Sequence, residues 1–491
     1  MAVILTTNTT IGINVSASGD TYITREGFYV AADTDAFDFV DFDNLEYFIE
    51  GDVFAGDDGI VASTGANNND ISIGFGASVQ AGGDGIQFFG NTVSDSGHDF
   101  VNNGSIVGLS GEGVDVRASF SSLINYGSIT GFGFGVFYSG TGNSVRNHGT
   151  VSSASTGIGL SGSNGEIRNF GGVIAESNGL DVSGGDYIIH NAGNISVGSI
   201  GIDAGSGSGN ILNAGNILAS IGVRMSAPTD SIEQNGRLTN SGEIHADSTG
   251  IDIVSVDSVD VFRVVNSGLV SVAAPDGDAL SGGGSVEILV NTGTLIGDVT
   301  LNGGDDVYFG TNGRVIGVVD GGAGDDILRG GDEDNDLDGG TGDDMLRGGG
   351  GDDELRGSAG HDELRGDAGD DLVSGGGGHD LMFGGLGDDD LKGFGGDDTL
   401  NGGQGDDLLS GGSGADVFQF YRNAGEDRIW DFQNGTDKID MTAFSVFFSD
   451  INAAMTSRWG NAIIDLDALG GSGTIIVNGA AGALDASDFI L

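Results

Sequence analysis

The feature that most constrains the fold of this chain is a nine-residue repeat that runs without interruption from position 321 to 419. Typical copies read "GGAGDDILR", "GGTGDDMLR" and "GGQGDDLLS". Among the eleven units, ten carry Asp at the sixth position, where Asn335 is the exception, and all eleven carry a large apolar residue at the eighth. A solvated acidic linker does not explain that apolar position, so the period indicates stacked structural units.

Each nonad divides into a turn and a strand. Glycine in the first part permits positive φ and close approach of the next coil. The last three residues predict a short strand whose eighth residue points inward. Two nonads make one coil, so the sixth residues stack 18 positions apart on two opposite edges. One edge carries Asp326, Asp344, Asp362, Asp380, Asp398 and Asp416, and the other carries Asn335, Asp353, Asp371, Asp389 and Asp407.

Stacked carboxylates repel one another unless a cation lies between successive coils. Carboxylate and carbonyl oxygens suit calcium better than a transition metal. We therefore predict several bound calcium ions, with these metal ligands: Asp326, Asp344, Asp353, Asp362, Asp371, Asp380, Asp389, Asp398, Asp407 and Asp416. Residues 321–419 hold 26 acidic and five basic side chains, so we expect them to stay expanded at cytosolic calcium and to fold in extracellular calcium.

The nonad resembles the G-G-x-G-x-D-x-U-x repeat of repeats-in-toxin (RTX) proteins, where U is a large apolar residue. This resemblance implies a parallel β-roll with calcium held between neighbouring turns. The following stretch, "EDRIWDFQNGTDKID", resembles the C-terminal flank of RTX proteins, including serralysin-type metalloproteases. The matching residues are Asp427, Ile429, Asp431, Phe432, Gly435, Asp437, Ile439 and Asp440.

The flank resemblance implies an uncleaved C-terminal signal for type I secretion, and a folded cap on the roll is an alternative that is compatible with it. The chain has no HExxH motif, so protease activity is not implied. His361 and His379 occupy the fifth position of their nonads, where other copies have Asp. With no third nitrogen ligand nearby in the sequence, surface substitution is favoured over a zinc site.

A second repeat precedes the nonads. An Asn-x-Gly element recurs at Asn positions 102, 125, 147, 169, 191, 213, 240, 266 and 291, and four successive intervals are 22 residues. A Gly-aliphatic pair runs in phase with it, which predicts coils of a parallel β-solenoid. We expect the asparagines to form an amide ladder, and Pro228 and Pro275 to lie in loops that lengthen their coils.

Composition argues against several classes of protein and of binding partner. The formal charge of −56 and a pI near 4.1 argue against nucleic acid or an anionic membrane as partner. The chain has no cysteine, and no run approaches the length of about 18 apolar residues that a membrane span needs. "MAVILTTNTT" lacks the basic region of a secretory signal peptide, which fits export by another route.

An enzyme is the alternative, because parallel β-helices often act on polysaccharides and some mannuronan epimerases join a β-helix to RTX modules. Two stripes are candidate catalytic positions: Arg146, Arg168 and His190, with Glu166 on the same face, and Asp181 with Asp203, followed by Arg224 and Asp252. Two carboxylates on adjacent coils would approach the separation of about 5 Å found in retaining glycosidases. A solvated charged face is the favoured explanation of each stripe, because exposed strand positions are often charged, and the Asp-Pro-His motif of the epimerases is absent.

The sequence thus predicts an all-β chain: an N-terminal cap (1–70), a parallel β-solenoid with coils of about 22 residues (71–300), an RTX β-roll (301–419) and a C-terminal β cap with secretion signal (420–491). We expect a secreted calcium-binding protein with a structural or adhesive role at the cell surface or in extracellular matrix, such as an adhesin or S-layer component. Type I secretion machinery, a surface glycan and further copies of the chain are the expected partners.

Overall fold

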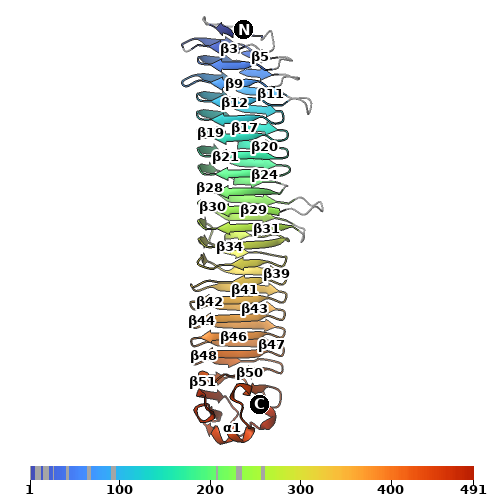
Figure 1. Ribbon diagram of the computed structural model, residues 1–491, viewed down its shortest axis with the longest axis vertical. Helices are drawn as coiled ribbons and strands as arrows, with labels where there is room; N and C mark the ends of the chain where they lie inside the picture. The colour runs from blue at the N-terminus through green and yellow to red at the C-terminus, as the bar shows by residue number, and fades with distance from the viewer. Residues whose placement is uncertain are drawn as a thin grey trace. The chain divides into compact units, whose positions relative to one another are not determined.

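The computed structural model describes residues 2–5, 13–14, 21–25, 27–39, 44–62, 68–89, 96–205, 208–227, 235–255 and 260–491. The chain forms two compact units, residues 1–256 with 262–279, and residues 257–261 with 280–491. Nearly all the strands pair in parallel with the strand one coil away, as the stacked arrows in Figure 1 show. The predicted all-β parallel solenoid is confirmed.

The first unit stacks its strands in three columns. The first column contains β1 (Ala2–Leu5), β3 (Thr21–Thr24), β6 (Glu46–Ile49), β9 (Asp70–Ile73), β12 (Asp99–Asn102), β15 (Ser122–Asn125), β18 (Ser144–Asn147), β21 (Gly165–Asn169), β24 (Tyr187–Asn191), β27 (Gly209–Asn213), β29 (Asn235–Asn240) and β31 (Val261–Asn266). The second contains β4 (Tyr29–Ala32), β7 (Asp52–Ala55), β10 (Ser78–Ala81), β13 (Ser105–Gly108), β16 (Ser128–Gly131), β19 (Thr150–Ser153), β22 (Gly172–Ala175), β25 (Asn194–Val197), and the first halves of β28 (Asn216–Ser226) and β30 (Glu243–Val254), then β32 (Leu269–Val272). The third contains β2 (Ile13–Asn14), β5 (Phe37–Phe39), β8 (Ile60–Ala62), β11 (Ile86–Phe89), β14 (Val114–Arg117), β17 (Phe134–Ser139), β20 (Thr156–Ser161), β23 (Leu180–Ser183), β26 (Ile200–Ala204) and the second halves of β28 and β30.

Side chains alternate between the core and solvent along each strand, as the period of two requires. In β18, Val145 and Asn147 are buried whereas Arg146 points outward. Gly157, in β20, shows why small residues are needed where successive coils pack closely: a Cβ there would lie 2.3 Å from Val173 Cγ1 and 2.7 Å from Gly179 O. The core is therefore an in-register stack of aliphatic side chains between closely packed turns.

The asparagine anchors form the predicted amide ladder. From Asn102 to Asn266, each Nδ2 donates to the Oδ1 of the next anchor at 2.8 Å, through Asn125, Asn147, Asn169, Asn191, Asn213 and Asn240. All of these side chains are at most 1% exposed. The ladder satisfies buried amides that would otherwise lose their hydrogen bonds to water. Pro275 lies in an exposed turn as predicted, and Pro228 lies outside the described residues.

The second unit stacks the nonads, together with strands that precede and follow them, in two main columns. One contains β34 (Val286–Asn291), β37 (Val307–Phe309), β40 (Ile327–Arg329), β42 (Met345–Gly350), β44 (Glu363–Ala368), β46 (Leu381–Leu386), β48 (Thr399–Gln404), β50 (Val417–Gln419), β52 (Lys438–Asp440) and β56 (Phe489–Ile490). The other contains β36 (Asp298–Thr300), β39 (Val319–Ala323), β41 (Asp336–Thr341), β43 (Glu354–Ala359), β45 (Leu372–Gly377), β47 (Asp390–Gly395), β49 (Leu408–Ser410), β51 (Asn423–Ile429) and β55 (Ser472–Val477). β35 (Thr294–Ile296) pairs with β38 (Arg314–Ile316) beside them, and β33 (Asp278–Ser281) spans the boundary of the two units in the sequence.

Successive strands of one column pair with a register of 18 residues, for example Leu346 with Leu364, so two nonads do form one turn. The eighth residues point inward as predicted and are fully buried, each 0% exposed: Leu328, Leu337, Leu346, Leu355, Leu364, Val373, Met382, Leu391, Leu400, Leu409 and Phe418. This continuous apolar stack is the core of the roll.

After residue 440 the parallel pattern gives way to a mixed segment. It contains α1 (Phe448–Ala454), the antiparallel strands β53 (Met455–Arg458) and β54 (Asn461–Asp465), and three short 3₁₀ turns at Thr442–Phe444, Asp467–Leu469 and Ala486–Asp488. Within the residues that the structure describes, every helix is too short or too polar to cross a lipid bilayer.

Candidate calcium-binding site

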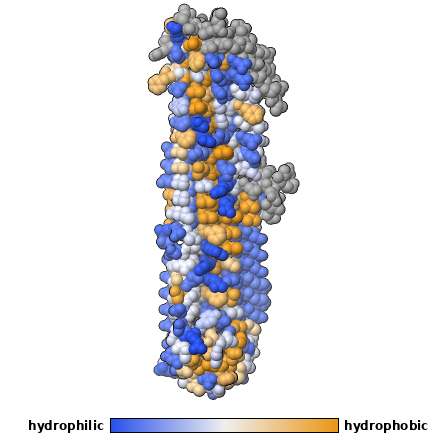
Figure 2. Space-filling model, viewed as in Figure 1, coloured by the Kyte–Doolittle hydropathy of each residue, from blue (hydrophilic) through white to orange (hydrophobic). Residues whose placement is uncertain are grey.

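The position-six residues of the nonads lie just before the strands of the roll, in two columns. The ten predicted aspartates are at most 3% exposed. Glycine at position four makes the turn that places them there, because its φ is positive, as at Gly342 (φ 134°) and Gly360 (φ 150°). The hydrophilic surface of the unit is visible as blue rows in Figure 2.

One oxygen of each of these carboxylates is held by the neighbouring turn. The backbone N–H of Asp326 donates to Asp344 Oδ1 at 2.8 Å, and that of Asp344 donates to Asp362 Oδ1 at 2.9 Å. The opposite column repeats the pattern, with the N–H of Asp353 donating to Asp371 Oδ1 at 2.8 Å. Backbone donors thus fix the orientation of each carboxylate in the column.

The other oxygen, Oδ2, is buried and has no hydrogen-bond donor in any of the ten. These residues are Asp326, Asp344, Asp353, Asp362, Asp371, Asp380, Asp389, Asp398, Asp407 and Asp416. At Gly384, a Cβ would lie 2.2 Å from Asp389 Oδ2 and 2.5 Å from Gly402 O, so carboxylate and carbonyl oxygens converge beside the glycine. A buried space that offers acceptors without donors fits a hard cation.

Burial raises the pKa of these carboxyls, and neighbouring aspartates raise it further in all of them except Asp380. The pKa is raised to about 6 for Asp344 and to about 7 for Asp362, with desolvation as the largest cause. For Asp389 it is raised to about 8, with Coulombic repulsion from Asp407 and Asp371 adding to burial. The metal-free column therefore disfavours its own ionised form.

Position five forms a separate, exposed ladder that runs in the opposite direction. The N–H of Asp343 donates to Asp325 Oδ1 at 2.9 Å. His361 and His379 stack with ring centroids 5.0 Å apart, and the Nδ1 atoms of both accept backbone N–H groups at 2.8 Å. Since these nitrogens already have partners, the geometry favours the surface-substitution interpretation over a zinc site.

The position-six ladder continues into the C-terminal flank. Asp407 N–H donates to Asp427 Oδ1 at 3.1 Å, and Asp416 N–H donates to Asp437 Oδ1 at 3.2 Å. Both flank residues are 1% exposed. Sequence reasoning matched them to the flank motif but did not assign them to the column, because their spacing from the nonads is 20 and 21 residues instead of 18.

Comparison with known proteins identifies these repeats. Residues 320–355, 347–382, 356–391 and 392–419 match the family model of the RTX calcium-binding nonapeptide repeat. This segment of the chain therefore consists of RTX calcium-binding repeats. A subunit of the mannuronan C5-epimerase of Azotobacter vinelandii, solved in solution, is 28% identical over 32% of this chain and 78% of its own, with a TM-score of 0.18. No curated protein matches the chain.

The basic stripe lies on the first column of the first unit. Arg146 pairs in register with Arg168, and Arg168 with His190. A cavity of about 150 Å³ is lined by Arg146, Arg168, Glu166 and neighbouring residues. Arg168 forms an ion pair with Glu166 through Nε, so part of the charge of the stripe is already neutralised.

The acidic stripe lies on the other sheet. Asp181 and Asp203 stand side by side in register on β23 and β26. Asn178 Nδ2 bridges them, 3.4 Å from Asp181 Oδ2 and 3.1 Å from Asp203 Oδ2. Burial raises the pKa of both, and Asp181 raises that of Asp203 further. Arg224 bonds Asp252 at 2.8 Å. The structure therefore brings the two carboxylates together, with Arg224 in register beside Asp203, but places them on a different sheet from Arg146 and Arg168.

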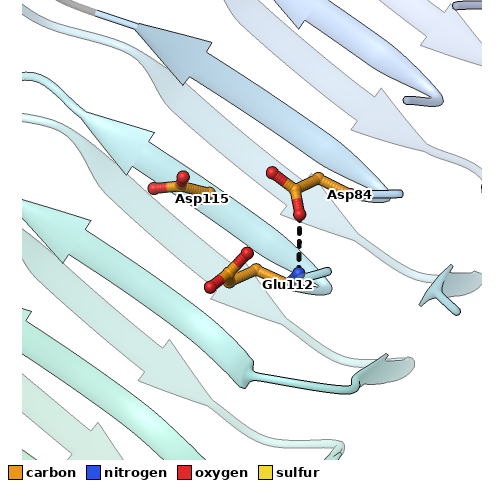
Figure 3. A group of neighbouring side chains, drawn as sticks. All are labelled: Asp84, Glu112 and Asp115. Atoms are coloured by element: carbon orange, nitrogen blue, oxygen red, sulfur yellow. Dashed lines mark hydrogen bonds between the residues drawn. The ribbon is translucent and has the colours of Figure 1, made fainter. Parts of the chain in front are cut away.

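Asp84, Glu112 and Asp115 form an acidic cluster that sequence reasoning missed (Figure 3). The stacking of coils brings Asp84 next to residues that lie 28 and 31 positions later in the sequence, so no local sequence motif predicts this cluster. Asp84 accepts hydrogen bonds from Glu112 N–H and Gln87 Nε2, and Asp115 forms an ion pair with Arg117 at 2.9 Å. Both oxygens of each of these two aspartates thus have donors, unlike the Oδ2 atoms of the roll aspartates.

Proposed function

We propose that the ten position-six aspartates hold calcium ions between successive turns of the roll. The observation that carries this proposal is the repeated, buried Oδ2 atom with no donor. The match to calcium-binding repeats supports the choice of metal. A calcium ion takes about six to eight oxygen ligands, which carboxylates and backbone carbonyls of adjacent turns can supply together.

We further propose that the protein acts outside the cell and that calcium there completes its folding. The net charge of −21 over residues 321–419 opposes compaction until a cation bridges the columns. RTX repeat proteins are typically secreted, which supports the extracellular location. Residues 420–491 are the candidate type I secretion signal. Deleting them should abolish export by a type I transporter, and export that persists would contradict this assignment.

The role that fits best is structural or adhesive, as a matrix, surface-layer or attachment component. Regular parallel stacking with a repetitive outer surface supports such a role, because it offers the same contacts many times over. Electron microscopy of the purified protein tests self-association. Calcium-dependent sheets or filaments would support it, whereas a monomer at all calcium concentrations would leave attachment to another partner as the role.

A direct test of the calcium site exploits adjacent residues with opposite environments. Asp371→Asn with Asp389→Asn removes two buried charges from one column, whereas Asp370→Asn with Asp388→Asn removes two exposed ones. Calorimetric titration should show fewer bound calcium ions for the first variant and the wild-type number for the second. Equal binding by the two variants would reject the position-six assignment.

A polysaccharide-binding or polysaccharide-active first unit is the second candidate. The basic cavity at Arg146, Glu166 and Arg168 favours it, because cationic groups recognise anionic sugars. Release of reducing ends or unsaturated uronates across a polysaccharide panel tests activity. Arg168→Ala and Asp203→Ala then test the two stripes, and activity that survives both substitutions would exclude them as the active site.

A further inference from the structure

The position-six ladder also continues in the opposite direction, upstream of the nonapeptide repeats. Asp306 N–H donates to Asp326 Oδ1 at 2.7 Å, and Glu287 N–H donates to Asp306 Oδ1 at 2.6 Å. These are the same backbone-to-carboxylate bonds that link Asp326 to Asp344 inside the repeats. Glu287 lies in β34 and Asp306 directly precedes β37, so both belong to the column that β40 and β42 continue.

Both upstream carboxylates have a buried oxygen without a donor. Glu287 is 1% exposed and Asp306 is 0% exposed. Glu287 Oε1 accepts the hydroxyl of Ser285, but Glu287 Oε2 and Asp306 Oδ2 have no partner. Among the described residues, no Lys, Arg or His forms an ion pair with either one.

This arrangement departs from the nonapeptide in its spacing and in its first residue. The spacings are 19 and 20 residues instead of 18, and Leu301 stands where the nonads have their first glycine. Both residues precede the first matched position, 320. Asp306 lies within residues 301–419, the range that the sequence assigns to the roll, and the register of the strands adds Glu287, which precedes that range, to the same carboxylate column.

We propose that Glu287 and Asp306 form a further calcium site, upstream of the RTX repeats and in line with their column. Two adjacent buried carboxylates without a compensating base are costly unless a cation or a proton neutralises them. The inference rests on the proposed calcium binding by the repeats and extends calcium-dependent folding to β34 and β37.

Counting bound ions tests this site in the full-length protein. Glu287→Gln with Asp306→Asn keeps the side-chain size and removes both buried charges. Asp305→Asn with Asp325→Asn is the matched control, since both residues are exposed. Native mass spectrometry at saturating calcium should show at least one ion fewer for the first variant and the wild-type number for the control. An unchanged number in the first variant would overturn the inference while leaving calcium binding by the repeats intact.

Hydrogen exchange of the wild-type protein tests the proposed site even if the Glu287→Gln, Asp306→Asn variant does not fold. The amides of Glu287 and Asp306 should gain protection when calcium replaces chelator and should not gain it with magnesium alone. Protection of these amides that is already complete in chelator would show that this segment folds without calcium and would overturn the proposed site. A wild-type protein that binds no calcium at all would instead overturn the proposed function itself.

Discussion

Gly342 shows how closely successive turns of the roll approach one another. Its φ is 134°, and an added Cβ would lie 1.9 Å from Gly324 O. Gly342→Ala should therefore lower the free energy of unfolding in calcium by more than about 2 kcal/mol, through backbone strain and steric clash together. Denaturant unfolding measures the change. Gly377→Ala is the control, because the nearest atom to its added Cβ is 4.0 Å away. Equal losses at both positions would contradict the close-approach argument.

Asn169 tests the amide ladder at the same scale. It accepts from Asn147 Nδ2 and donates to Asn191 Oδ1, and it is 0% exposed. Asn169→Ala leaves both neighbours without their partner, which should cost about 1–3 kcal/mol per unsatisfied buried group. The thermal unfolding midpoint should fall accordingly. Asn210→Ala removes an exposed amide of the same type and should leave that midpoint nearly unchanged.

At the scale of the element, the carboxylate column predicts that the free energy of unfolding depends on pH in an unusual direction when calcium is absent. The folded pKa values of the column are raised from 3.8, to about 6 for Asp344 and to about 8 for Asp389. The folded column thus binds more protons than the unfolded chain. Its free energy of unfolding is highest below pH about 4 and falls as pH rises toward 8.

Circular dichroism in chelator, titrated from pH 8 to pH 4, should therefore show β structure increasing as acid is added. In calcium the trend should reverse, since protons compete with the metal for the same oxygens. A metal-free spectrum that does not change with pH, or that loses β signal on acidification, would contradict the burial of these carboxylates.

At the scale of the whole molecule, the formal charge of −56 governs compactness. In chelator we expect an enlarged hydrodynamic radius that 1 M NaCl reduces only in part, because salt screens exposed charges to a Debye length of about 3 Å but cannot enter the buried columns. Millimolar calcium should reduce the radius further and restore the β signal. Size-exclusion chromatography with light scattering measures both effects. Full compaction by NaCl alone would show that general repulsion, and not a specific cation, controls folding.

The sequence by itself determined the local periods and what each position does. The eighth residue of the nonad builds the core, the sixth faces the column, and the Asn anchors form a ladder, because a strict period repeats one environment in every coil. The sequence also predicted calcium as the bound ion, since carboxylates aligned at a fixed spacing repel one another unless a cation lies between them.

Only the tertiary structure decided contacts between residues whose spacing breaks the period. Glu287 and Asp306 join the column at spacings of 19 and 20 residues, and Asp84 meets Glu112 across coils. It also placed Asp181 and Asp203 on a different sheet from Arg146 and Arg168. The physical reason is that core packing along the stack sets the strand register, while extra residues are accommodated in loops. The sequence distance between two residues therefore does not show whether their turns are neighbours.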